Sequence, residues 1–157
     1  MTLMDAQVYD EGRARRRRKY IIIAIIAALI LAWVGYHLRD YPERRAVGKF
    51  LVALEQGNLD VAYGLWFQDP DWKQHPQKYS NYTISDFTQD WGPAGQWGII
   101  KSSNVNCSYA TGNGVIVQAT VNDRAEHLYI WVDKKDNTLH FSPTEIDCGN
   151  WWGWLTE

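Results

Sequence analysis

A run of 19 uncharged, mostly apolar positions near the start of the chain dominates its hydropathy pattern. Residues 20–38 read YIIIAIIAALILAWVGYHL and contain no Asp, Glu, Lys or Arg. A helix of this length spans roughly 28 Å at 1.5 Å per residue, close to the ~30 Å hydrocarbon core of a bilayer. Because a small domain rarely encloses a helix that is apolar all round, the pattern predicts a transmembrane helix rather than a buried core helix.

Basic residues precede this run and set its expected orientation. Residues 1–19 hold six Arg and Lys, whereas only Arg39, Arg44 and Arg45 follow closely. The positive-inside tendency therefore predicts a cytoplasmic tail (1–19), a span (20–38) and a domain outside the cytoplasm (39–157). The residues expected to determine this topology are Arg15, Arg16, Arg17, Arg18 and Lys19. These basic residues could also bind anionic lipid, but their role in setting the topology is enough to explain them.

Two export signals are the alternatives to an uncleaved anchor. A cleaved signal peptide ends in a small-residue A-x-A-like site, and a lipoprotein signal ends at a cysteine. No A-x-A-like site follows the apolar run, and no cysteine lies near it. The paired arginines also suggest a twin-arginine signal, but the run after them is long, strongly apolar and without a processing site. The sequence favours a signal anchor that is retained.

Apolar positions at helical spacing follow the span. Pro42 ends or kinks the first helix, because proline has no N–H to donate. Residues 43–58 predict a second helix with Gly57 at its C-cap, and Asn58 is placed to cap a third. The faces expected to be apolar consist of Ala46, Val47, Phe50, Leu51 and Leu54, and then of Val61, Ala62, Leu65 and Trp66.

The rest of the domain is expected to pass from loop to helix to sheet. Residues 68–82 are polar, contain two prolines and show no period, which predicts a long surface loop. The capping-box spacing of Thr83 and Asp86 predicts a short helix that stops at Gly92 and Pro93. Strands are then expected at 97–109, 115–122, 127–132 and 138–142. This order predicts an α+β domain whose antiparallel sheet of about four strands curls around the helices.

The helical hairpin resembles the opening of the nuclear-transport-factor-2-like (NTF2-like, or cystatin-like) superfamily. A phenylalanine-containing helix leads there into a second helix with the pattern G-(N/D)-x-x-x-A-Y, matched here by Phe50, Gly57, Asn58, Ala62 and Tyr63. The resemblance covers about residues 43–145. The whole plan is similar to uncharacterised bacterial membrane proteins of this superfamily. Its members include isomerases, dehydratases, protein-binding modules and secretion scaffolds, so the resemblance leaves the function open.

An enzyme of this superfamily would place an Asp/His/Tyr set inside a cone-shaped pocket. The resemblance implies five pocket or ligand candidates: Tyr63, Trp66, Asp86, Asp90 and His140. The polar candidates also have a simpler, structural interpretation, in which each is a helix cap, a surface acid or a hydroxyl at the pocket rim. The chain has no nucleophile elbow, no Gly-rich phosphate loop and no metal-ligand spacing among its histidines. We therefore expect no catalytic residue, no cofactor and no metal.

The charge of the predicted domain narrows the class of partner that it can bind. Residues 39–157 carry ten Arg and Lys against fifteen Asp and Glu, which argues against nucleic acid as a partner.

Cys107 and Cys148 are the only cysteines, and both lie in the domain predicted to be extracytoplasmic. We predict a disulfide that stabilises the domain by roughly 3–4 kcal/mol through loop-closure entropy, with two buried free thiols as the alternative.

The tryptophan-rich end is the most unusual local feature. Trp151, Trp152 and Trp154 are candidates for contact with the membrane interface or with a partner, although packing over an open edge of the domain is the simpler interpretation.

The function that the sequence favours is a membrane-anchored binding or scaffold domain, whose partner is another protein or a second copy of this chain. The alternative is a pocket for an apolar or aromatic small molecule, which fails if Phe50, Trp66, Phe87 and Trp91 fill the interior.

Overall fold

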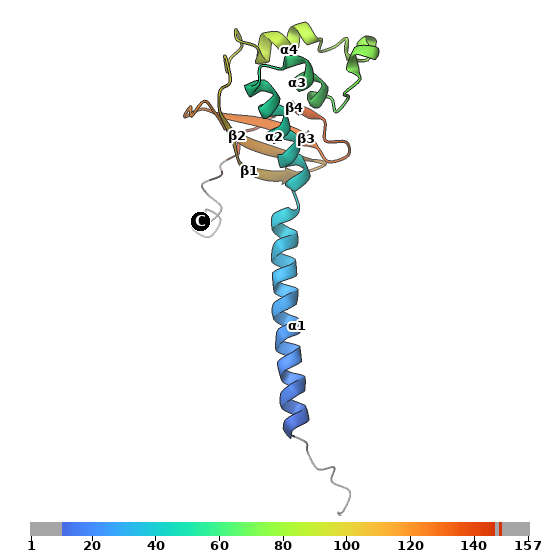
Figure 1. Ribbon diagram of the computed structural model, residues 1–157, viewed down its shortest axis with the longest axis vertical. Coiled ribbons are helices and arrows are strands. Elements are labelled where there is room, and N and C mark those ends of the chain that lie inside the picture. The colour runs from blue at the N-terminus through green and yellow to red at the C-terminus, as the bar shows by residue number, and fades with distance from the viewer. Residues whose placement is uncertain (1–10, 147, 149–157) are drawn as a thin grey trace, which may run out of the picture. The chain divides into compact units, whose positions relative to one another are not determined.

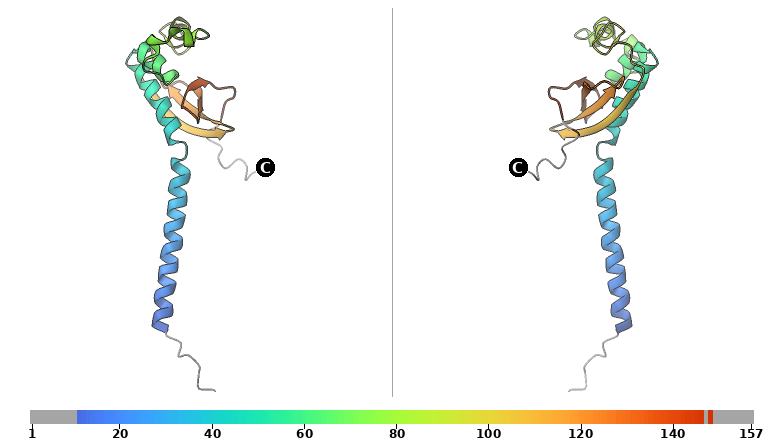
Figure 2. Two further views of the ribbon diagram at one scale, coloured as in Figure 1. Left: turned by 90° about the vertical axis from the view of Figure 1, so that its right-hand side faces the viewer. Right: turned by 90° about the vertical axis from the view of Figure 1, so that its left-hand side faces the viewer.

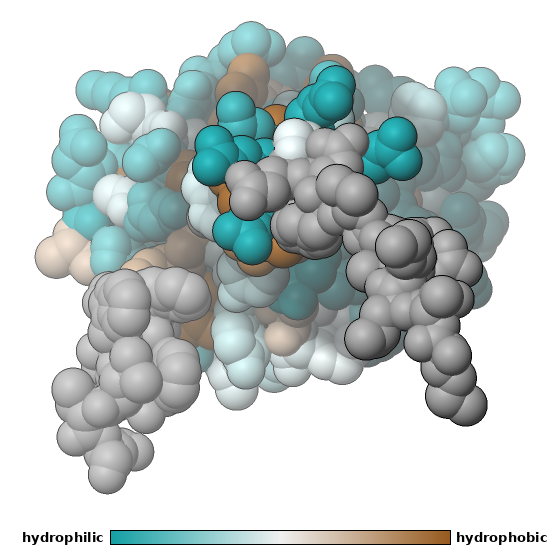
Figure 3. All heavy atoms as spheres, turned by 90° about the horizontal axis from the view of Figure 1, so that it is seen from below, coloured by the Kyte–Doolittle hydropathy of each residue, from teal (hydrophilic) through white to brown (hydrophobic). Residues whose placement is uncertain are grey.

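The computed structural model describes residues 11–146 and residue 148. The chain divides after Arg39 into two compact units. The first contains α1 (Glu11–Leu38), drawn in blue in Figure 1. Every described side chain of α1 between Gly12 and Tyr36 is exposed. Looking along α1 from its N-terminal end, Figure 3 shows hydrophilic side chains in front and hydrophobic ones behind them.

Among the described residues, α1 is the one helix long and apolar enough to cross a membrane, judged by length and composition. None of its apolar stretch is buried in the structure, in contrast to the core helix of a soluble domain. A helix of this kind near an N-terminus serves as a membrane anchor or as an export signal.

The second unit begins with the expected helical hairpin, formed by α2 (Tyr41–Glu55) and α3 (Leu59–Trp66). α2 carries Pro42 in its first turn, where the missing N–H costs nothing. Gly57 follows with φ +68°, a left-handed conformation that glycine adopts without strain. The Asn58 side chain accepts a hydrogen bond from Val61 N at 3.2 Å, which confirms the predicted N-cap.

The face predicted for α3 was wrong at Val61. Ala62, Tyr63 and Trp66 point into the core, and Val61 lies about 100° further round the helix. Val61 is 49% exposed. A helix of eight residues buries only one stripe, so the apolar residue beside that stripe stays in contact with solvent.

Residues 68–82 are more ordered than their composition suggested. They form two short 3₁₀ helices, η1 (Trp72–Gln74) and η2 (Pro76–Tyr79). Tyr79 is buried and Trp72 is half-buried, because both rings pack against Tyr63 at centroid distances of 6.1 and 4.6 Å. The prediction of a surface loop was therefore wrong at these two aromatic positions.

α4 (Ile84–Trp91) follows with the predicted capping box. Thr83 Oγ1 accepts from Asp86 N at 3.3 Å, and Asp86 Oδ2 accepts from Thr83 N at 2.8 Å. Gly92 caps the other end, and Pro93 follows it. These reciprocal bonds satisfy two backbone N–H groups that a helix start otherwise leaves unpaired.

Four antiparallel strands complete the unit: β1 (Ser103–Thr111), β2 (Gly114–Val121), β3 (His127–Asp133) and β4 (Leu139–Phe141). They pair in sequence order, with a bulge in β1 between Val105 and Cys107. Figure 2 shows the curled sheet lying beside α2, with the shorter helices towards one end. The unit is an α+β fold, as predicted.

The first strand starts six residues later than the sequence suggested. Trp97 and Ile100 are buried in the core, and Gly98 has φ +62°, which interrupts an extended strand. The side chain of Asn122 holds this segment, because its Oδ1 accepts from Lys101 N at 2.7 Å and its amide donates to Ile99 O at 2.9 Å. Residues 97–102 are therefore an anchored loop.

The core lies between α2 and the sheet, where alternate residues of β2 (Val115, Val117, Ala119 and Val121) join the hydrophobic cluster. On the opposite face of β2, Ile116 and Gln118 are also buried. A central strand covered on both faces is typical of a sheet that has something packed on each side.

Candidate functional site

Aromatic rings fill the space between the helices and the sheet. Phe50, Trp66, Phe87 and Trp91 are each at most 3% exposed. The ring of Phe50 lies 4.9 Å from that of Trp91 and 5.3 Å from that of Trp66, and Trp66 lies 5.5 Å from Trp91. Phe141 of β4 stacks on Trp91 at 6.0 Å and remains half-exposed. We call these five rings the aromatic plug.

The two candidates on α3 have structural contacts. Trp66 belongs to the aromatic plug. Tyr63 is buried, and its hydroxyl donates to Tyr82 O at 2.6 Å. Burial raises the pKa of Tyr63, so its phenol stays neutral and serves as a donor to the backbone. This bond ties α3 to the segment that leads into α4.

The two acids on α4 are exposed and already engaged. Asp86 belongs to the capping box, and the hydrogen bonds from Thr83 hold the pKa of its carboxyl below the usual range. Asp90 accepts a 2.7 Å bond from the Tyr82 hydroxyl. Burial, followed by this bond to Asp90, raises the pKa of Tyr82. Neither acid points into an enclosed pocket, so the plainer interpretation of both fits the structure.

His140 lies elsewhere, on an exposed position of β4. Its ring packs at 5.2 Å from that of Trp131 in the neighbouring strand. The five candidates therefore occupy the plug, a buried position that binds the Tyr82 carbonyl, a helix cap, the outside of α4 and the outside of the sheet. The structure does not bring them together around one cavity within the described residues.

A groove beside α3 is a hollow that sequence reasoning missed. Its volume is about 450 Å³. We call it the α3 groove; it is lined by Asp60, Val61, Gly64, Leu65, Gln68, Pro70, Trp72 and Lys73. Gly64 sets its depth, because a Cβ at this position would lie 3.0 Å from Asp69 O and 3.3 Å from the Trp72 ring. The backbone of the following segment is fixed there by a 2.8 Å bond from Asp69 N to Gly64 O.

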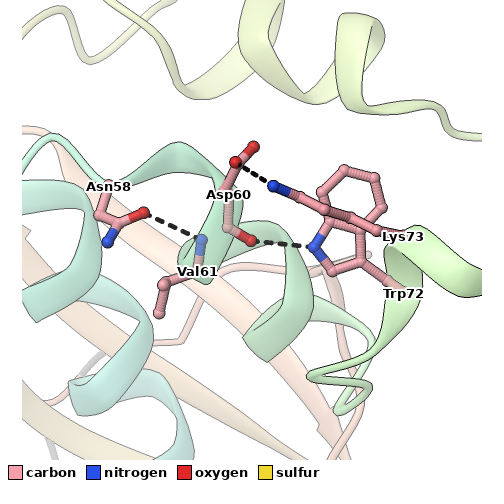
Figure 4. A network of polar contacts seen from close by, with 5 residues as sticks. All are labelled: Asn58, Asp60, Val61, Trp72 and Lys73. Atoms are coloured by element: carbon pink, nitrogen blue, oxygen red, sulfur yellow. Dashed lines mark hydrogen bonds and ion pairs between the residues drawn. The ribbon is translucent and has the colours of Figure 1, made fainter.

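Polar contacts at one rim hold the groove's largest wall in place (Figure 4). Trp72 Nε1 donates to Asp60 O at 3.1 Å, and Lys73 Nζ forms an ion pair with the Asp60 carboxylate. The ammonium of Lys73 also lies 5.5 Å from the centre of the Trp72 ring. The indole is thus held between a carbonyl and a cation, while Val61 and Leu65 leave an apolar strip beside it.

A second hollow lies on the outer face of the sheet, with a volume of about 710 Å³. Its walls include Asn106, Gln118, His127, Tyr129, Glu145, Ile146 and Cys148. Cys148 is joined to Cys107 in a disulfide across a Cα distance of 5.9 Å, which confirms the predicted pairing. The pairing fastens the segment after β4 to β1. Trp151, Trp152 and Trp154, predicted as an interface, lie outside the described residues.

A third hollow lies at the start of α2, with a volume of about 240 Å³. We call it the basic hollow; it is lined by Tyr41, Pro42, Arg45, Ala46, Lys49, Gln68 and Asn137. Arg45 and Lys49 stand one helical turn apart on the exposed face of α2. All three hollows lie outside the aromatic plug.

Within residues 11–146 and 148, no group of three His, Cys, Asp or Glu side chains is arranged to hold a metal ion. Comparisons of the chain with profiles of known families, with curated proteins and with solved structures find no match.

Proposed function

We propose that this chain is a membrane-anchored binding domain that holds a protein partner at the outer face of the bacterial cytoplasmic membrane. The observation that carries the proposal is the contrast between the filled interior and the open α3 groove. The aromatic plug leaves no room between the helices and the sheet, whereas Val61 leaves apolar surface open to solvent.

The α3 groove has the features of a site for one large apolar side chain of a partner. Apolar walls supply the burial energy, and the rim of Asp60 and Lys73 supplies hydrogen-bonding groups around it, as in the centre and edge of protein interfaces. Trp72 is already held by Asp60 O, so little side-chain freedom is lost when a partner docks.

The proposed location rests on α1 and on the disulfide. Residues 20–38 of α1 are free of Asp, Glu, Lys and Arg, and a helical segment of this kind is most stable in lipid; the basic residues in the first turns of α1 favour a cytoplasmic N-terminus. The bond between Cys107 and Cys148 suits an oxidising compartment, which agrees with a periplasmic domain at residues 39–157. Protease added to spheroplasts should digest the domain and leave the basic tail protected; a protected domain would overturn this orientation.

We also propose that the outer domain is NTF2-like. A helical hairpin, a short further helix and a curled antiparallel sheet follow one another in the order that the resemblance implies. The isomerase-like members of the superfamily bind their substrates in the cone-shaped pocket between the helices and the sheet. The aromatic plug occupies that space here, so the interior offers no support for the alternative of a small-molecule pocket.

Site-specific photocrosslinking in native membranes tests the α3 groove. Val61 and Val52 make a matched pair, because they are 49% and 48% exposed on neighbouring helices and only Val61 lines the groove. A photoreactive residue at position 61 should give a discrete adduct, and one at position 52 should not. An adduct of twice the 18.2 kDa chain would identify a second copy as the partner.

Substitution supplies the second half of the test. Val61→Glu places a charge on the apolar strip and should weaken the complex by about 2 kcal/mol, as expected for a residue central to an interface. Val52→Glu should leave the complex intact. Equal adducts from both positions, or a complex indifferent to Val61→Glu, would remove the groove from the proposal.

A further inference from the structure

The basic hollow at the start of α2 concentrates positive charge that the domain does not neutralise. Arg45 and Lys49 are exposed, stand at i and i+4, and have no ion-pair or hydrogen-bond partner among the described residues. Like charges at this spacing repel and reduce helix stability. The arrangement therefore has an energetic cost that a bound anion would offset.

The walls around these cations add hydrogen-bond donors. The Tyr41 hydroxyl and the Asn137 amide belong to residues that line the hollow. Asn137 ends the turn that carries Lys134, whose Nζ lies 4.0 Å from the Asp40 carboxylate. This contact keeps the β3–β4 turn beside the start of α2.

The acids of that turn are committed to its own backbone. Asp133 accepts from Lys135 N at 2.8 Å, and Asp136 accepts from Thr138 N and from the Thr138 hydroxyl. The hydrogen bonds from Thr138 also lower the pKa of Asp136. Neither carboxylate forms an ion pair with Arg45 or Lys49, so the acids of the turn do not neutralise these two cations.

Chain connectivity keeps the hollow near the end of α1. Tyr41 follows Leu38 by three residues, a separation of at most about 11 Å even in a fully extended chain. Arg45 comes one helical turn later. If α1 spans the bilayer, the anions nearest to these cations are the phosphates of the outer leaflet.

We propose that the basic hollow binds the phosphate of an anionic phospholipid headgroup in the outer leaflet. Arg45 and Lys49 neutralise the phosphate, and Tyr41 and Asn137 offer hydrogen bonds to the headgroup. The choice of a lipid, rather than a free phosphate, rests on the proposed membrane anchoring. It adds a second attachment of the domain to the bilayer besides α1.

Thermal unfolding of the full chain in an uncharged detergent measures this binding. Near-ultraviolet circular dichroism follows the Tm of the outer domain while short-chain phosphatidylglycerol, phosphatidylcholine or inorganic phosphate is titrated. The basic N-terminal tail also attracts anionic lipid. Lipid bound to the tail leaves this Tm unchanged, because the tail binds equally whether the domain is folded or unfolded.

Phosphatidylglycerol should raise the Tm of the unsubstituted chain at lower concentrations than phosphatidylcholine does. The variant with Arg45→Gln and Lys49→Gln should bind it about 25-fold more weakly, at about fivefold per basic residue. The same variant without lipid should have an equal or slightly higher Tm, since the repulsion is gone. Lys101→Gln, an exposed lysine outside the hollow, is the control and should keep the lipid response.

A Tm insensitive to phosphatidylglycerol, or equally sensitive in the double variant, overturns the proposal. Inorganic phosphate that acts as strongly as the lipid overturns the assignment to a headgroup. Anchoring is tested separately by alkaline carbonate washing of membranes, because binding in micelles does not require α1 to cross a bilayer. Release of the chain by carbonate would overturn the anchoring, whatever the hollow binds.

Discussion

α1 and α2 follow each other with two residues between them, yet they place apolar side chains in opposite surroundings. The isoleucines and leucines of α1 are all exposed. α2 instead buries one face, made of Glu43, Ala46, Val47, Phe50, Leu51, Ala53 and Leu54. Both are regular helices, so helix formation does not decide where their apolar surface goes.

The difference between them lies in the arrangement of apolar positions. In α2 these positions form a stripe that one sheet can cover, and polar residues occupy the rest of the helix. In α1 they surround the helix, and no single protein surface covers such a cylinder. The structure therefore indicates that α2 is stabilised by the domain, whereas α1 keeps its apolar surface exposed, as a membrane anchor or an export signal does.

The largest effect is expected from truncating the buried face of α2. Phe50→Ala removes a fully buried ring that contacts three other rings of the aromatic plug, and should lower the free energy of unfolding by about 3–5 kcal/mol. Val52→Ala, two positions away on the exposed face, should change it by less than about 0.5 kcal/mol. Urea unfolding of the detergent-solubilised chain gives both values. Similar losses from the two changes would mean that α2 has no buried side.

A charge in the middle of α1 should have the next largest effect. Leu29→Arg places a guanidinium near the centre of the span, at a cost of about 2.5–3.5 kcal/mol for insertion. The fraction of the chain that resists carbonate extraction should fall. Val52→Arg adds the same charge to the exposed face of α2 and should leave extraction unchanged. An α1 indifferent to Leu29→Arg would not behave as a membrane span.

Sequence reasoning succeeded where the deciding signals are local. Gly57, Asn58 and Thr83 fix the helix ends through contacts with residues at most four or five positions away, so the sequence shows them directly. The disulfide followed from having two cysteines in one domain. The alternation in β2 and β3 placed those strands to within one residue at each end.

Sequence reasoning failed where the local structure depends on residues far away in the chain. Residues 97–102 look like a strand, but Trp97 and Ile100 are buried in the core and the side chain of Asn122 binds the backbone at Ile99 and Lys101. The α3 groove was missed because the exposure of Val61 depends on how a short helix is rotated. Its depth depends on the approach of Trp72 to Gly64, which no local pattern reports.

The smallest effects are expected at the cap of α4, a helix that shares the amphipathic character of α2. Thr83→Ala removes the side chain that accepts from Asp86 N, and should cost about 1 kcal/mol of stability. Thr88→Ala, within the same helix, removes only a bond to Ile84 O and is the matched control. Equal changes in Tm for the two variants would show that the capping box does not stabilise the domain.

The same cap gives a pH dependence with a defined sign. The pKa of Asp86 is lowered in the folded state, so its contribution is complete above the unfolded pKa of about 3.9 and is lost as the pH falls through the lower folded value. Asp86→Asn should flatten the decline of Tm below about pH 4. A decline equally steep in the variant would assign it to other carboxyls.

The bulge in β1 has a consequence for copies of this chain that lie close together. β1 is an outer strand of the sheet formed by the described residues, and outer strands invite pairing with a neighbouring molecule. The irregular register between Val105 and Cys107, beside the cysteine that holds the segment after β4, makes that rim a poor template. Copies that lie side by side are thereby less prone to pair sheet to sheet, and reduction of the disulfide should weaken that protection.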